Sequence, residues 1–437
     1  MTNAPHLLYI AWGFPPSRAG GVYRALATVN AFAAQGWRVT VLTADRETYA
    51  RYTGADVSLE AQVAPGVDVV RVPFQWPAQD TDVRRYSWLR VALPPLWVRV
   101  RRALDQVRFP EPSYGPWLPP LLEAATAIHR RTPVDLTIAT ANPHVTFAAA
   151  HGLQRRHGVP FVMDYRDAWR LDVFTGVETK SRGSRVGRAE ARMIAAAREV
   201  WFVNEPIRAW HAEQDPAHAN AMHVVANGWD PTLLDFPVQR AAVAGRGLRY
   251  AYLGTVTPKV PLAEVLDGWR LALAEGAIPA GSTLTIGGHL GYFAVPQGRL
   301  SDLVSGAADD GVSYVGPVAK AAVGAFYEDA DVLVLALGSG RYVTSGKVYE
   351  YVAAGRPIVA VHDEHNATTS VLADHPLVAR VDAVDAASVA TALAEGARMA
   401  HESTPDDDAR VQALAQSYRR DHQLTPRITA LTEGLVR

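Results

Sequence analysis

TSGKVYEYVAAGRPIVA, at residues 344–360, has the pattern of a short helix followed by a buried strand. Thr344 or Ser345 can cap the start of the helix, a glycine can end it, and the final apolar run is typical of a buried strand. Lys347 then lies in the first helical turn, where free N–H groups and the helix dipole are already positive. A cation is stabilised there when an anion binds in front of the helix, so this pattern is typical of a phosphate site.

Glu350 follows Lys347 by three residues. An exposed ion pair between these two side chains is the alternative interpretation of the same residues. The organisation of the remaining chain favours the phosphate site.

Length and composition restrict the class of protein. A chain of 437 residues exceeds one hydrophobic core, which predicts two domains. The net charge of −1 and the motifs give no support for nucleic-acid binding, and zero cysteines exclude disulfides, thiolate metal sites and a cysteine nucleophile. No apolar run has the length of a membrane span, and residues 7–12 read as a first strand rather than a signal peptide, so we expect a cytoplasmic protein.

The first half alternates short apolar runs with segments of helical periodicity, which is typical of parallel α/β units. Strands are predicted within 6–12, 39–43, 67–72, 135–140, 159–165, 199–204 and 222–228, and helices at 22–34 and 144–157.

Two prolines and an Ala/Gly-rich stretch at 241–247 predict a linker, after which a second α/β series begins. Its strands are predicted within 248–254, 283–288, 312–316, 331–337 and 358–361, and its helices at 260–274, 386–399 and 406–435. We therefore predict two doubly wound Rossmann-like domains, 1–238 and 239–410, facing each other across a ligand-binding cleft, and a C-terminal helix in 411–437.

The segment 83–120 departs from this alternation because it is rich in Arg, Trp and Pro. Residues 96–104 have the pattern of a basic amphipathic helix with Trp97 and Val100 on one side. Two interpretations stay open: peripheral contact with the inner face of an anionic membrane or with a lipid-linked acceptor, or a helical excursion with a solvated arginine face.

Eight motifs occur in a familiar order: FPPSRAGGVYRA, GWRVTVLT, DLTIATANP, VPFVMDYRDAW, ANGWD, YLGT, SYVGPV and SGKVYEYVAAGRPIVAV. In this order the chain resembles the retaining nucleotide-sugar glycosyltransferases of family 4, which have the two-domain GT-B fold. The helix followed by Ala-Ala-Gly-x-Pro-Ile-Val is the most specific of the eight. Within the family the chain is most similar to the members that build cell-surface or secreted glycans.

The resemblance implies a nucleotide-sugar donor bound mainly by the C-terminal domain and a glycan, lipid-linked or small-molecule acceptor bound mainly by the N-terminal one. It also implies that the last helix crosses back to the first domain. No cofactor and no metal are expected, because cations and backbone N–H groups hold the diphosphate in similar enzymes. The leaving phosphate takes the acceptor proton in the front-face substitution proposed for the family, so we nominate no protein nucleophile.

Several residues of the second half match donor-binding positions of the family. Lys347, Lys259 and the N–H groups near Ser345 and Gly346 would hold the diphosphate, and Glu350 would accept hydrogen bonds from the ribose. The base would rest on the backbone at Gly316 and Pro317. A solvated loop lysine and a plain Gly-Pro turn are the alternatives for Lys259 and for the last two residues.

Three places in the first half are also candidates. Gly20 and Gly21 allow backbone N–H groups to approach the donor, although any tight turn between a strand and a helix can use them. His144 opens a helix and can approach the sugar, with a structural role as the alternative.

Asp164 and Asp167 follow a strand at the edge where α/β folds bind ligands. Either carboxylate can bind or polarise the acceptor hydroxyl. The alternative is a pair with Arg166 that shapes the loop.

The chain departs from the family pattern at two positions. Tyr342 stands where many members carry a first glutamate, and Thr255 stands where an arginine is common. Two other functions therefore stay open: a nucleotide-sugar epimerase of the same fold, and a nucleotide-sugar binder without catalysis.

Overall fold

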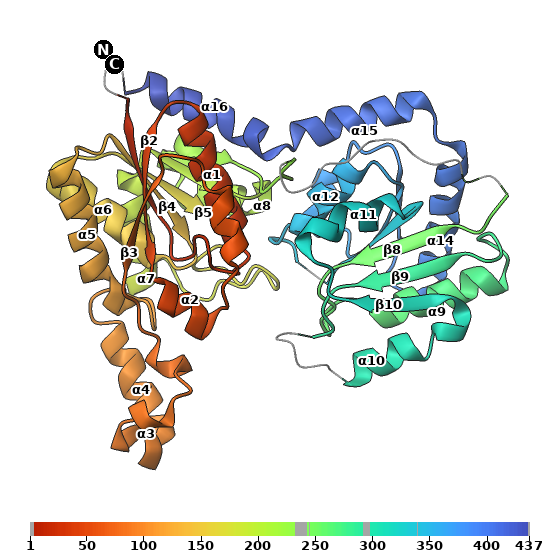
Figure 1. Cartoon of the computed structure of the whole chain (residues 1–437), viewed down its shortest axis with the longest axis horizontal. Coiled ribbons are helices and arrows are strands. Elements are labelled where there is room, and N and C mark those ends of the chain that lie inside the picture. The colour runs from red at the N-terminus through yellow and green to blue at the C-terminus, as the bar shows by residue number, and fades with distance from the viewer. Residues whose placement is uncertain (1–3, 232–242, 244, 292–297, 339, 436–437) are drawn as a thin grey trace. The chain divides into compact units, whose positions relative to one another are not determined.

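The computed structural model describes residues 4–231, 243, 245–291, 298–338 and 340–435 (Figure 1). The chain divides into two compact units. The first contains the residues up to Asp172, Val177–Val225 and the residues from Leu424 on, and the second contains Val173–Gly176 and Ala226–Gln423. The predicted boundary between residues 238 and 239 lies outside the described residues.

The first unit is built on a seven-stranded parallel sheet with the order β3-β2-β1-β4-β5-β6-β7. Its order reverses between β1 and β4, which is where doubly wound sheets bind ligands at the carboxyl ends of the strands. Its strands are β1 His6–Ile10, β2 Arg38–Ala44, β3 Asp68–Val72, β4 Leu136–Ala141, β5 Phe161–Tyr165, β6 Glu199–Phe202 and β7 Met222–Val224. Its helices are α1 Val22–Ala34, α2 Arg46–Tyr52, α3 Trp88–Ala92, α4 Pro94–Asp105, α5 Leu118–Arg131, α6 Val145–His157, α7 Arg185–Ala196 and α8 Glu205–Gln214.

The second unit has a six-stranded parallel sheet with the order β10-β9-β8-β11-β12-β13, and its reversal lies between β8 and β11. Its strands are β8 Arg249–Leu253, β9 Thr283–Gly287, β10 Val312–Gly316, β11 Val332–Ala336, β12 Ile358–Val361 and β13 Val378–Arg380. Its helices are α9 Leu262–Ala274, α10 Gly298–Ser305, α11 Val323–Glu328, α12 Gly346–Ala354, α13 Thr368–Val371, α14 Ala386–Glu402 and α15 Pro405–Ser417. The prediction of two doubly wound α/β sheets is confirmed.

The predicted single helix at 406–435 is wrong, because α15 ends at Ser417 and a further helix, α16 Arg420–Glu433, begins after a break. The backbone of Trp229 occupies the break: its N–H donates to the carbonyl of Tyr418 (3.1 Å), and its carbonyl accepts from Arg420 (2.9 Å). Gly228 permits this approach, since it has a φ of +58° and a Cβ there would lie 2.5 Å from the Tyr418 oxygen.

Helix α16 begins in the second unit and continues into the first. Its apolar residues Leu424, Ile428 and Leu431 are buried in the first unit's core with Leu7 and Tyr9 of β1. Within the described residues, no helix is both long enough and apolar enough to cross a membrane.

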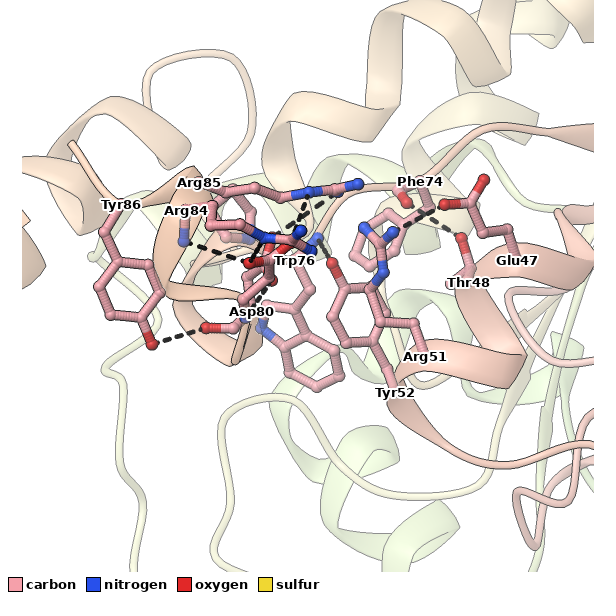
Figure 2. Close-up of polar contacts among 12 residues, drawn as sticks. Glu47, Thr48, Arg51, Tyr52, Phe74, Trp76, Asp80, Arg84, Arg85 and Tyr86 are labelled. Carbon is pink, nitrogen blue, oxygen red and sulfur yellow. Dashed lines mark hydrogen bonds and ion pairs between the residues drawn. The ribbon is translucent and has the colours of Figure 1, made fainter.

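Helices α3 and α4 project from the rest of the first unit (Figure 1). The predicted helix at 96–104 lies within α4, but Asp105 is the only buried residue recorded for the two helices. Figure 2 shows the base of this projection, where the backbone N–H of Trp76 donates to the Tyr52 hydroxyl (3.2 Å) and the Tyr86 hydroxyl donates to the carbonyl of Asp80 (3.0 Å). These bonds hold the base of the projection together with an aromatic cluster around Trp76.

A buried ion pair joins α1 to β5. Both carboxylate oxygens of Asp164 accept hydrogen bonds from the Arg24 guanidinium, the shortest at 2.6 Å, and a third nitrogen of Arg24 donates to the carbonyl of Val225 (2.9 Å). The alternative interpretation, a pair with Arg166, is wrong for Asp164, because Arg24 is its partner and Arg166 donates to the carbonyl of Ala141 (2.7 Å).

We predict that Arg24→Met lowers the free energy of unfolding by about 3–5 kcal/mol, because it leaves the Asp164 carboxylate buried without a counter-ion. The double variant Arg24→Met/Asp164→Leu should regain most of that loss, since no charge stays buried. Urea denaturation followed by circular dichroism measures both. Equal losses in the two variants would contradict the assignment.

Candidate functional site

Helix α12 begins at the switch point of the second unit without a side-chain cap. Ser345 is the N-cap residue, but its side chain makes no capping hydrogen bond, and Gly346 is exposed in the first turn. Gly355 ends the helix with a φ of +69°, as the sequence predicts. The first N–H groups of α12 therefore have no cap from the N-cap side chain and are available to an anion.

Lys347 lies half-buried in this first turn. Its Nζ donates to the hydroxyl of Tyr252, at the end of β8 (3.1 Å), and lies 4.3 Å from the centroid of the same ring. An aromatic face attracts an ammonium group but does not neutralise its charge. The alternative of an exposed Lys347–Glu350 ion pair is wrong, because Glu350 has other partners.

Gly254, the residue after β8, makes room for the Lys347 amine. It has a φ of +151°, and a Cβ at this position would lie 2.2 Å from Nζ. Any larger residue would both strain the backbone and displace the ammonium group. The loop after β8 and the start of α12 therefore form one structure around this cation.

Burial lowers the pKa of Lys347 from 10.5 to about 8, and the Glu350 carboxylate acts weakly in the opposite direction. The amine is therefore still mostly protonated at neutral pH, at a cost in solvation. A bound anion would offset that cost and raise the pKa again. This is the electrostatic state expected of a cation that binds phosphate.

Glu350 is held by two groups that the sequence analysis missed. Its Oε1 accepts from the Nζ of Lys320 (2.5 Å), and its Oε2 accepts from the hydroxyl of Tyr327 (2.9 Å). A carboxylate has about four acceptor sites, so capacity remains for a diol. One signal could have found Lys320: the chain has only four lysines, at 180, 259, 320 and 347, and three of them lie in this unit.

The other donor-side candidates lie at the same carboxyl edge of the sheet. Gly316 ends β10 with a φ of +75°, its carbonyl accepts from the Gly288 N–H (2.7 Å), and Pro317 follows. Lys259 is exposed in the loop after β8, and its Nζ lies 4.2 Å from the ring centroid of Phe174. No contact among the described residues joins Lys259 to Lys347, so the role of Lys259 as a second cation stays a prediction.

In the first unit, Gly20 is exposed and Gly21 is the N-cap residue of α1 with an ordinary φ of −74°. A Cβ at Gly21 would lie 1.7 Å from the Arg166 guanidinium, so the absence of a side chain at Gly21 leaves the space that Arg166 occupies. Asp164 is completely buried, whereas Asp167 is half-buried and accepts from the Asn142 amide (2.9 Å). Of the two aspartates, Asp167 is the one accessible to an acceptor.

His144 is buried at the start of α6 and is held by Glu111, which sequence analysis missed. One oxygen of Glu111 accepts from the His144 backbone N–H (2.9 Å) and lies 3.2 Å from Nδ1, while the other accepts from the Val145 N–H (2.7 Å). The ring stacks on Trp169 with centroids 4.8 Å apart. Glu111 thus caps α6 and fixes the His144 ring, so His144 has a structural role. Its contact with the sugar stays a prediction.

The described residues contain no cluster of three His, Asp or Glu side chains arranged to hold a metal ion. The side chains gathered at the second unit's switch point are Lys320 and Lys347, the hydroxyls of Tyr252 and Tyr327, and the ion-paired carboxylate of Glu350.

Comparison with known proteins supports the architecture. No protein-family model and no curated protein sequence matches the chain. Among solved structures, a glycosyltransferase from Rickettsia africae has a TM-score of 0.64 at 10% identity, covering 100% of this chain and 99% of the other. The chain has the GT-B fold.

Two further structures with this fold were solved with ligands. The Anabaena protein HepE in complex with UDP and glucose has a TM-score of 0.60 at 13% identity, over 98% of this chain and 99% of HepE. The catalytic domain of starch synthase IV from Arabidopsis thaliana, bound to ADP and acarbose, has a TM-score of 0.61 at 11% identity over 100% of both chains. At these identities the similarity establishes the fold alone, and membership of family 4 stays a prediction.

We predict that one lysine amine titrates with a midpoint near pH 8 in the free protein, because burial lowers the pKa of Lys347. Reductive ¹³C-methylation gives NMR signals from four lysines and the N-terminus, few enough to assign by single substitutions. The N-terminal amine also titrates near pH 8 and is identified because its signal survives every lysine substitution. The lysine signal near pH 8 should vanish in Lys347→Met. If a lysine signal near pH 8 survives, another lysine is responsible and the burial argument fails.

The same shift has a defined effect on stability. The folded-state pKa lies below the unfolded value, so the unfolded chain binds more protons between pH 8 and 10.5. The contribution of Lys347 to the unfolding free energy is therefore most unfavourable below pH 8 and becomes less so as the pH rises to 10.5. Lys347→Met should remove this slope from the pH profile of the urea midpoint.

Proposed function

We propose that the protein is a glycosyltransferase that moves a sugar from a nucleotide-sugar donor to an acceptor hydroxyl, in glycan or glycoconjugate biosynthesis. The observation that carries the proposal is the ammonium group of Lys347, half-buried beside the uncapped start of α12 at a switch point of the GT-B fold. The complexes of HepE with UDP and glucose and of starch synthase IV with ADP and acarbose support it by analogy of fold.

The donor would lie with its diphosphate against Lys347 and the N–H groups near Ser345 and Gly346. When the bond between the anomeric carbon and the diphosphate breaks, negative charge grows on the departing oxygen. A preorganised ammonium and helix N–H groups stabilise that charge more strongly than they stabilise the intact donor. Lys259 is the proposed second cation, and no metal is required.

Glu350 would bind the ribose hydroxyls while Lys320 and Tyr327 hold its carboxylate in position. The base would rest on the backbone at Gly316 and Pro317, the turn that follows β10.

The acceptor would bind the first unit near Asp167, while the backbone N–H groups at Gly20 and Gly21 keep their predicted approach to the donor. The acceptor oxygen forms the new bond to the anomeric carbon on the face that the diphosphate leaves, and its proton passes to the leaving diphosphate. This path retains the anomeric configuration and needs no nucleophile from the protein. Asp164 is left out of the chemistry because Arg24 already occupies its carboxylate. His144 keeps only its buried Nε2 for a contact with the sugar, since Glu111 engages its Nδ1 and backbone N–H.

The acceptor belongs to the class of glycans, lipid-linked glycans or small hydroxyl compounds, and the proposal includes peripheral membrane contact through 83–120. Tyr342 and Thr255 keep two alternatives open, an epimerase and a binder without catalysis. Turnover of the donor separates them: transfer requires an acceptor, epimerisation proceeds without one, and a binder shows neither.

We predict that Lys347→Ala lowers kcat/KM for transfer by about 10²–10³-fold, because it removes a cation that acts mainly in the transition state. The donor is first identified by thermal shift with UDP, GDP, dTDP and ADP sugars; ligand at a hundred times Kd stabilises the fold by about 2.7 kcal/mol. Exposed Lys180 provides the matched control, and Lys180→Ala should retain full activity. Full activity of a folded Lys347→Ala would refute the proposed site.

Two conditions test the same chemistry without substitution. A chelator should leave the rate unchanged, and a strict requirement for added metal would contradict the proposed diphosphate contacts. Donor affinity should fall as the pH rises above about 8, since the free amine loses its proton there. Lys347→Met should show no such fall.

A further inference from the structure

A strongly basic groove of about 880 Å³ lies on the first unit, along α5, α6, α7 and the segment 108–110 that follows α4. Its lining includes apolar Leu118, Leu122 and Met193 but no acidic residue. Six arginines line it: Arg108, Arg155, Arg156, Arg185, Arg188 and Arg192. The groove extends along the outer helices rather than along the strand ends, so it is separate from the acceptor loops.

The charge of this groove is not neutralised within the protein. All six arginines are exposed, and none forms an ion pair with a carboxylate in the part of the chain that the structure describes. Elsewhere exposed arginines do have such partners, for example Arg46 with Glu60 (2.7 Å) and Arg270 with Asp310 (2.7 Å). Burial lowers the pKa of His151, and the positive charges of Arg155 and Arg192 lower it further.

Large exposed apolar side chains occur in the segment that leads into the groove. Helices α3 and α4 and the residues after them expose Trp88 (76%), Val91 (66%), Leu104 (61%) and Val107 (65%). Val107 precedes the groove residue Arg108, and its carbonyl accepts from Arg185 of α7 (3.3 Å). Large exposed apolar side chains gathered in one short segment of the chain are typical of a surface that binds a partner or a membrane.

We propose that the projection α3–α4 and the arginine groove form one docking surface for a bilayer containing anionic phospholipids. The apolar side chains of α3 and α4 enter the interfacial layer, and the groove arginines bind lipid phosphates, which match the planar guanidinium group. A bilayer is favoured over nucleic acid because the exposed apolar side chains are mainly aliphatic, whereas single-stranded nucleic acids stack on aromatic ones. The inference rests on the peripheral membrane contact of the proposed function, to which it adds the groove and the lipid class, and it does not depend on the donor chemistry.

Flotation of the full chain tests this surface. The protein should float with vesicles of phosphatidylcholine and phosphatidylglycerol, should not float with phosphatidylcholine alone, and should be released by high salt. Equal binding to both kinds of vesicle would overturn the role of the arginines.

Two matched variants distinguish the effect of charge in the groove from the effect of the total charge of the protein. Arg155→Glu/Arg192→Glu should weaken vesicle partitioning by at least about tenfold, since each arginine near an anionic surface contributes several-fold. Arg130→Glu/Arg131→Glu makes the same change in charge at exposed positions in the last turn of α5, outside the groove lining, and should have a small effect. An equal loss in both would overturn the proposal.

Trp88→Ser/Leu104→Ser tests the apolar part and should also weaken partitioning at least about tenfold, while the unfolding temperature stays unchanged because both side chains are exposed. Unchanged partitioning of this variant would overturn the insertion.

Absence of vesicle binding together with tight binding of polyphosphate or RNA would assign the groove to a soluble polyanion instead. Nucleotide-induced thermal shifts should be the same in all variants, which keeps this test separate from the donor site.

One readout needs no lipid. Arg155→Gln/Arg192→Gln should raise the pKa of His151 in an NMR titration, because both neighbouring charges lower it. An unchanged His151 would show that the arginines do not create the local field on which the docking surface depends.

Discussion

The contact between the Lys347 ammonium and the ring of Tyr252 is the constraint on which the candidate site depends. It requires the helix to begin at Gly346, β8 to end where Tyr252 can face that helix, and Gly254 to leave room for the amine. The strand order of the sheet places these elements together, because the order reverses between β8 and β11 and the elements meet at the edge next to this reversal. A cation that is only partly solvated is thus maintained by backbone geometry rather than by a carboxylate.

Local features of this site and fold could be predicted from the sequence. The helix at 22–34 is confirmed because its apolar spacing matches one buried face, and Gly355 ends α12 because glycine accepts its left-handed backbone. The partners of Asp164 and His144 could not be predicted. Arg24 lies 140 residues from Asp164, and Glu111 lies 33 residues from His144. Neither periodicity nor capping rules carry information about pairs so distant.

The chain uses lysine and arginine for different physical tasks. Its buried ion pairs use arginine, as Arg24 with Asp164 and Arg170 with Glu190, because a guanidinium group stays charged and donates in a fixed fork. Lysine is rare, and Lys320 and Lys347 both lie at the second unit's switch point. An ammonium group changes its pKa readily when it is buried. Of these two residue types, only lysine can therefore provide a cation whose charge responds to a bound anion near neutral pH.

A net charge of −1 excludes a strong field around the whole molecule, but it does not describe any one surface. Carboxylates accompany the buried arginines of the first unit, whereas the groove arginines Arg155 and Arg192 have none in the described chain. Repulsion among close cations destabilises the fold when nothing compensates it. Solvent ions compensate it weakly, since each is mobile, and a fixed array of phosphates compensates it strongly. The arrangement is therefore the one expected where the compensating charge comes from another surface.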